Sequence, residues 1–151
     1  MSNCIFSLTN KGIGLNKANF YYLASGGATQ NVPSGGTVKF NNVEASNGFG
    51  WNGSSTITIL QTGTYRIIIA INYGYINNNV EFGLLVNGIL MSGVFGQFIP
   101  LATGVGQIFG EWTVPLGAGD TIKIVNTSNA VVIKQAGTND ERVANLSISN
   151  I

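Results

Sequence analysis

The clearest pattern in the chain is a strict alternation of side chains between residues 65 and 73. Every odd position there holds a large apolar residue. The even positions read Arg66, Ile68, Ala70 and Asn72. Because successive side chains of a β-strand point to opposite faces of its sheet, this segment predicts a strand with its odd side in a core. The even side is too apolar for open water and too polar for a closed core.

A second alternating run supports the same type of structure. Between Val80 and Val86 the even positions are all large and apolar, and Asn87-Gly88 follows directly before another apolar residue. Asn-Gly between apolar flanks is the strongest short-range signal for a two-residue hairpin, because both turn residues must adopt positive φ. We therefore expect a hairpin centred on these two residues.

Short runs rich in β-branched and aromatic residues recur along the chain, separated by Gly and Asn, whereas no segment sustains a helical period. About ten strands are expected, and this number fits an all-β, two-sheet jelly-roll sandwich. Their ranges are Asn19–Ala24, Thr37–Val43, Ser55–Leu60, Gly63–Tyr75, Asn79–Val86, Ile89–Gly93, Phe109–Pro115, Asp120–Thr127, Val131–Gln135 and Arg142–Ile151. Residues 1–17 lack alternation and are expected to form a flexible N-terminal arm, followed by one domain at 18–151.

Composition excludes several classes of partner. Charged residues make up only 9% of the 151, and the seven Lys and Arg are scattered, so no basic patch for nucleic acid is expected. The longest aliphatic run, residues 67–71, is far too short to span a bilayer. The first residues lack the pattern of a Sec-type signal peptide. Cys4 is the only cysteine, so no internal disulfide can form.

Candidate catalytic chemistry is sparse. The chain has no His, which removes the commonest general base and the usual nucleophile–base pairs. An enzyme would have to rely on a pair of carboxylates across a pocket, and no cofactor is expected. The six candidates are Glu44, Glu81, Glu111, Asp120, Asp140 and Glu141. Asp140 and Glu141 could hold Ca²⁺ with Asn139, but EF-hand spacing is absent, and a solvated loop is the alternative.

Aromatic and amide side chains are the remaining candidates for a binding site. Phe49 and Trp51 are flanked by Gly and Asn and are expected on a loop, where they and Asn77, Asn78 and Asn79 could contact a sugar. A larger aromatic set could form a stacking platform or could simply fill a core and an interface between chains. It comprises Tyr73, Tyr75, Phe95, Phe98, Phe109 and Trp112.

The order of four short motifs resembles the tumour necrosis factor and complement component 1q globular domains. Gly63-Thr64-Tyr65 is similar to that family's Gly-x-Tyr strand start, and Leu84 to Gly88 to its hairpin. Residues 116–122 resemble its Gly-Asp turn, and residues 144–148 its closing strand. The low charge and abundant Asn are closer to bacterial members, the C-terminal domains of BclA-type collagen-like glycoproteins of the spore exosporium.

The resemblance implies a compact homotrimer of jelly rolls. The family pattern places Arg66 and Ile68 at the threefold axis, and the whole even face of the strand, with Ala70 and Asn72, fits an interface. A buried Arg66 would need a partner or water. The Gly-X-Y tract of a collagen-like stalk is absent from the sequence, so the chain is expected to be a globular head alone or a stalkless relative.

Two functions remain open on sequence alone. The first is a non-enzymatic, trimeric head on a bacterial spore surface that contacts other surface proteins or host molecules. The second is a carbohydrate- or receptor-binding tip of a bacterial or phage fibre, with Phe49, Trp51 and residues 77–79 as its ligand loops. The oligomeric state and the accessibility of the two aromatics separate these hypotheses.

Overall fold

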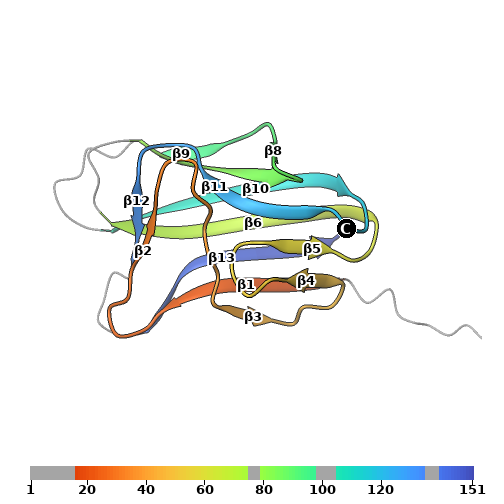
Figure 1. Ribbon diagram of the computed structural model, residues 1–151, viewed down its shortest axis with the longest axis horizontal. Coiled ribbons are helices and arrows are strands. Elements are labelled where there is room, and N and C mark those ends of the chain that lie inside the picture. Colours follow the sequence, from red (N-terminus) through yellow and green to blue (C-terminus); the bar gives the residue numbers. More distant parts are fainter. Residues whose placement is uncertain (1–15, 75–78, 98–104, 135–139) are drawn as a thin grey trace, which may run out of the picture.

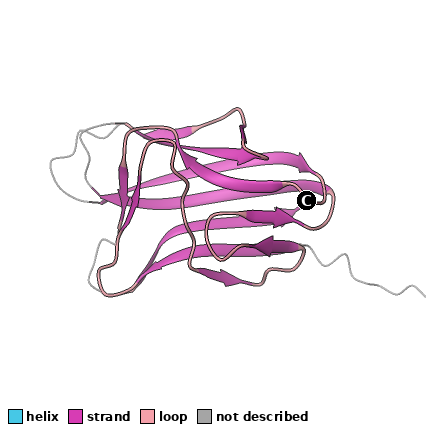
Figure 2. Ribbon diagram, in the orientation of Figure 1, coloured by secondary structure: helices cyan, strands magenta, loops and turns pink. Residues whose placement is uncertain are grey.

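The computed structural model describes residues 16–74, 79–97, 105–134 and 140–151. These residues form two antiparallel sheets, and the apolar side chains between the sheets make one core (Figure 1). Figure 2 shows strands and loops only. Within the described ranges no helix is long and apolar enough to cross a membrane.

The larger sheet has seven strands in the order β2–β12–β6–β13–β1–β3, with β10 on the opposite edge of β6. Its strands are β1 (Lys17–Ala24), β2 (Gln30–Val32), β3 (Asn42–Glu44), β6 (Gly63–Gly74), β10 (Val105–Leu116), β12 (Val131–Ile133) and β13 (Glu141–Asn150). β6 pairs with β10 over its whole length and with β13 over residues 65–71. It is therefore the strand that organises this sheet.

The smaller sheet has six strands in the order β4–β5–β11–β7–β8, and β9 also pairs with β7. Its strands are β4 (Phe49–Trp51), β5 (Ile57–Ile59), β7 (Val80–Val86), β8 (Ile89–Leu90), β9 (Phe95–Gln97) and β11 (Thr121–Asn126). Asn87 and Gly88 between β7 and β8 have φ of 51° and 81°. The expected hairpin and its turn chemistry are confirmed.

The odd side of β6 lies in the core. Tyr65, Ile67 and Ile69 are fully buried, as are Phe82 and Ile124 of the opposite sheet. Burial of this kind supplies most of the free energy that holds two such sheets together. The all-β, jelly-roll architecture and the parity of the central strand are as the sequence predicts.

The described residues form thirteen strands, whereas about ten were expected, and the additional ones are short. β2, β4 and β9 have three residues each and lie in stretches rich in Gly or Asn. In the expected strand Thr37–Val43, sheet pairing begins only at Asn42, whereas residues 37–38 run beside β11. These strands were not predicted because their residues favour turns. Tertiary contacts, and not local propensity, cause them to pair.

β10 begins at Val105, four residues before the expected start at Phe109. The expected range left out Gly106 and included Gly110, and the sandwich requires glycine at both positions. A Cβ atom at Gly110 would lie 2.5 Å from the ring of Phe95, and one at Gly106 would lie 2.4 Å from the ring of Tyr73. Glycine is thus needed in this strand for close approach of aromatic rings, as is typical of glycine inside a sheet.

The predicted arm at residues 1–17 lies outside the described residues except for its last two positions. The carbonyl of Asn16 accepts a hydrogen bond of 2.9 Å from the N–H of Asn150, and Lys17 is the first residue of β1. The sheet therefore starts one residue before the expected domain boundary at Ala18.

A buried amide joins the two sheets at the end of β11. Asn126 is 0% exposed, and its Nδ2 donates to the carbonyls of Val32 (3.0 Å) and Asn129 (2.7 Å). Its Oδ1 accepts from the backbone N–H and the hydroxyl of Ser128. Val32 belongs to β2 in the other sheet, so one side chain satisfies polar groups from both layers.

We expect Asn126→Ala to lower the free energy of unfolding by about 3 kcal/mol, because buried donors and acceptors lose their partners. Urea denaturation at one fixed protein concentration measures the change. Asn129→Ala is the matched control, since only the backbone carbonyl of this exposed residue takes part. Equal stability of the two variants would contradict the assigned role.

Candidate interaction surface

The side chains that point away from the core on β10, β6, β13, β1 and β3 form one continuous surface, which we call the outer face. On β6 it consists of Arg66, Ile68, Ala70 and Asn72. Arg66 is exposed and the other three are half-buried. The structure thus brings the four predicted interface residues together on one side of one strand, outside the core of the protomer.

The register places specific neighbours beside these residues. Ile68 lies between Glu111 of β10 and Ser147 of β13, and Ala70 lies between Phe109 of β10 and Asn145 of β13. Phe109 is 64% exposed, although it sits in the middle of a twelve-residue strand. A large apolar ring so placed contributes little to the fold of one protomer and is free to contact another molecule.

Arg66 is paired on this surface. Its Nε and Nη2 donate to the two carboxylate oxygens of Glu111 at 2.8 and 2.9 Å, a bidentate geometry that fixes both side chains. Both groups are about half exposed. The hydrogen bonds, reinforced by the attraction of opposite charges, lower the pKa of Glu111 below its ordinary value of 4.5 and raise the pKa of Arg66. The partner that a buried Arg66 would need is therefore already present.

A second ion pair closes the other edge of the outer face. Both Nη atoms of Arg142 donate to the carboxylate of Glu44, and the guanidinium carbon lies 4.0 Å from the centre of the Tyr21 ring. The hydrogen bonds from Arg142 lower the pKa of Glu44. Two of the six carboxylates of the chain are thus neutralised on this one surface.

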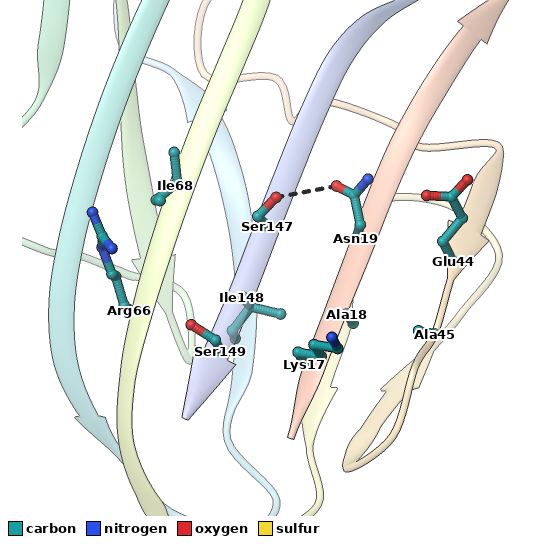
Figure 3. Close-up of a pocket in the computed structure, with 10 residues that line it drawn as sticks. All are labelled: Lys17, Ala18, Asn19, Glu44, Ala45, Arg66, Ile68, Ser147, Ile148 and Ser149. Atoms are coloured by element: carbon teal, nitrogen blue, oxygen red, sulfur yellow. Dashed lines mark hydrogen bonds between the residues drawn. The ribbon is translucent and has the colours of Figure 1, made fainter. Parts of the chain in front are cut away.

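Between these ion pairs the outer face is hollowed (Figure 3). The hollow has a volume of about 390 Å³, and the Ser147 hydroxyl donates to Asn19 Oδ1 across it at 3.2 Å. It is lined by Lys17, Ala18, Asn19, Glu44, Ala45, Arg66, Ile68, Ser147, Ile148 and Ser149. Within the described part of the chain Lys17 makes no ion pair, so the hollow carries one uncompensated positive charge.

The expected placement of Phe49 and Trp51 on an open loop is wrong. Both lie on β4, where Phe49 is 5% exposed and packs edge-on against the ring of Tyr65 at 5.6 Å. Trp51 is half-buried against Phe20, and its Nε1 donates to the carbonyl of Ser54. The flanking glycines form a turn and allow neighbouring side chains to approach the backbone of this short strand. The two aromatic rings pack against the core.

The other predicted ligand residues are not brought to these two aromatics as a site. Asn77 and Asn78 lie outside the described residues, and Asn79 is exposed just before β7. In the larger aromatic set, Tyr73 and Trp112 are buried and Phe95 packs edge-on against Trp112. Packing accounts for these three, Tyr75 and Phe98 fall outside the described ranges, and Phe109 is the exposed member.

Two further carboxylates, those of Asp120 and Asp140, have structural roles. Asp120 accepts hydrogen bonds from the Asn87 side chain and the Gly117 N–H, which lower its pKa and hold two turns together. Asp140 accepts bonds from Ser25 and Gly26 across a loop, whereas Asn139 lies outside the description. No group of three or more metal-ligating side chains occurs in the part of the chain that is described.

Sequence reasoning missed the contribution of β10 to the outer face. Glu111 was recognised only as an isolated carboxylate and Phe109 only as one of several aromatics. The available signal was the alternation from Ile108 to Leu116, in which even positions are buried and odd positions exposed. Which strand would lie beside β6 could not be read from that alternation, so the pairing of Glu111 with Arg66 remained hidden.

Comparisons with known proteins agree on fold and family. A sequence model described as the BclA C-terminal domain matches residues 4–151. The Eiger tumour necrosis factor of S. frugiperda superposes with a TM-score of 0.69 at 13% identity, covering 91% of this chain and 92% of the other. Murine APRIL at pH 5.0 (0.64, 9%, covering 91% and 99%) and the globular domain of zebrafish complement 1qA (0.64, 16%, covering 89% and 97%) are similar. No curated protein sequence matches.

The charge pair on the outer face predicts a pH dependence. Because the pKa of Glu111 is lowered in the folded chain, the pair stabilises fully above the ordinary pKa of 4.5. That contribution is lost as the pH falls through the lower, folded-state value. In urea denaturation between pH 7 and 3, Glu111→Gln should therefore lose less stability below pH 4.5 than the parent.

Glu81→Gln is the control for this measurement, since Glu81 forms no ion pair among the described residues. It should follow the parent profile. Equal losses of stability in Glu111→Gln and in the parent between pH 7 and 3 would show that the pair does not affect folding.

Proposed function

The chain belongs to the family of BclA C-terminal domains, and from this we propose that it is a non-enzymatic, trimeric head displayed on the surface of a bacterial spore. The observation that carries the proposal is the family match, which spans residues 4–151. The family points to the exosporium, and the jelly-roll fold shared with tumour necrosis factor and complement 1q domains is consistent with it.

The outer face supports self-association. Ile68, Ala70 and Phe109 provide apolar area at its centre, and the Arg66–Glu111 pair provides the polar component. Burying a charged group in the core of an interface costs free energy when the group has no partner. The bidentate Arg66–Glu111 pair enters such an interface with its hydrogen bonds already made. We therefore assign Arg66, Ile68, Ala70 and Asn72 to the contact between protomers.

The described residues favour this surface over a catalytic centre. The two ion pairs and the turn at Asp120 occupy three of the carboxylates, and the chain contains no His. Phe49, the aromatic expected to serve a sugar site, is in the core. A role in assembly and in contact with other spore-surface proteins is the function that this chemistry serves best.

Sedimentation in dilute solution tests the assembly. We expect three times the 15.9 kDa of one chain for the parent and the monomer mass for Ile68→Asp, because a new carboxylate beside Glu111 would repel its partners. Thr58→Asp on β5, a half-buried position on the outside of the other sheet, is the control and should remain trimeric. A monomeric parent would rule out the proposal.

Labelling of intact spores tests the location. An antibody raised against this domain should bind unbroken spores of the source bacterium, and the signal should leave with the exosporium when that layer is stripped. Binding that appears only after the spores are broken open would contradict display on the surface.

A further inference from the structure

The ring of Phe109 and the hollow between β6 and β3 lie on the same outer face, and we infer that they are two halves of one contact. Phe109 of each protomer enters the hollow of the next protomer in the ring. The inference rests on the proposed trimer and adds to it the identity and direction of the contact.

Phe109 is suited to be the inserted group. Its ring is 64% exposed, and β10 pairs in the described structure only with β6, so its other edge has no strand partner. A long edge strand that carries an exposed aromatic ring favours association with another chain. Aromatic side chains that insert into a pocket are also the residues that most often dominate the affinity of an interface.

The hollow is suited to receive a ring. Ile68 supplies an apolar wall, and Asn19 and Ser147 hydrogen-bond to each other, so their polar groups are partly satisfied before anything binds. Among the described residues, no side chain of the same protomer fills this volume of about 390 Å³. Figure 3 shows the ten lining side chains spread over β6, β13, β1 and the segment at β3.

Electrostatics favours the same occupant. Glu44, which lines the hollow, is held by Arg142, so no unpaired carboxylate lines it in the described structure. Lys17 remains as an ammonium without an ion pair there. The face of an aromatic ring attracts a cation, so a phenyl ring matches both the apolar wall and the free charge.

The far side of the hollow, at β1 and β3, is out of reach of Phe109 of the same protomer. Neighbouring strands are about 4.8 Å apart, so β1 lies roughly 14 Å and β3 roughly 19 Å from β10 across the sheet. A Phe side chain cannot bridge that span. In a closed trimer each contact joins two different patches, one from each neighbouring protomer. The exposed phenyl ring of Phe109 near one edge of the sheet and the hollow near the other edge meet this requirement.

The positions along the strands are compatible. Phe109 aligns with Ala70 and Asn145, whereas the middle of the hollow aligns with Ile68, Ser147 and Asn19, two residues further along. Two residues correspond to about 7 Å. In the proposed trimer, an inclination of the strands to the threefold axis would bring the ring and the hollow to one level.

Photo-cross-linking tests the contact directly. Phe109 is replaced by p-benzoylphenylalanine, which keeps an aromatic ring at the position, and Cys4→Ser removes the thiol. Labelled and unlabelled chains are mixed, so that mass spectrometry separates links between chains from links within one. We expect links between chains to the peptides of β1 and β13 that contain Asn19 and Ser147.

The outcomes separate the inference from the proposed function. A trimer whose links join β10 to β10, or that forms no link to β1 or β13, overturns the inference and leaves the trimer standing. A chain that sediments as a monomer overturns both.

A second pair of variants measures the energetic role. Phe109→Ala should raise the dissociation constant of the trimer by about 30-fold or more, the effect of removing a dominant interface residue. Thr113→Ala, an exposed position on the same side of β10, is the matched control and should change it less than threefold. Equal effects of the two substitutions would contradict insertion of the ring.

Discussion

The alternation along β6 is the constraint on which the rest of the structure depends. Hydrogen bonds on both of its edges fix β6 between β10 and β13, so its side chains can face only two directions. The odd side chains fill the core. The even side chains therefore lie on the outer face. Any function of that face depends on Arg66, Ile68, Ala70 and Asn72.

On the neighbouring strand β10, glycines determine how the inward-facing side packs against the core. Gly110 leaves room for the ring of Phe95, which packs against Trp112 and closes the edge of the sandwich between β7 and β10. Trp112 in turn donates to the carbonyl of Gly93 at 2.7 Å. The inward-facing side chains of β10 pack in the core, whereas Phe109 and Glu111 point outward from it.

The sequence predicted those features that depend on local pattern. Alternation identified the core parity of β6, and Asn87-Gly88 identified its hairpin, because positive φ is a property of the residues themselves. The local pattern did not predict the environment of residues whose contacts come from a partner strand. Phe49 looks like a loop aromatic until Tyr65 is placed beside it, and Glu111 looks isolated until β10 is placed beside β6. Both are pairings between residues distant in sequence, which periodicity does not encode.

Low charge makes the placement of the ion pairs informative. With only 9% charged residues, the described chain nevertheless places two Arg–carboxylate pairs on one face of one sheet. Exposed pairs of this kind add little to the stability of a protomer, because water and salt screen them. Their effect grows when a second molecule excludes the water, and because each charge already has its partner, covering them leaves no unpaired ion. The outer face therefore has the polar groups that an interface tolerates and the apolar residues that it requires.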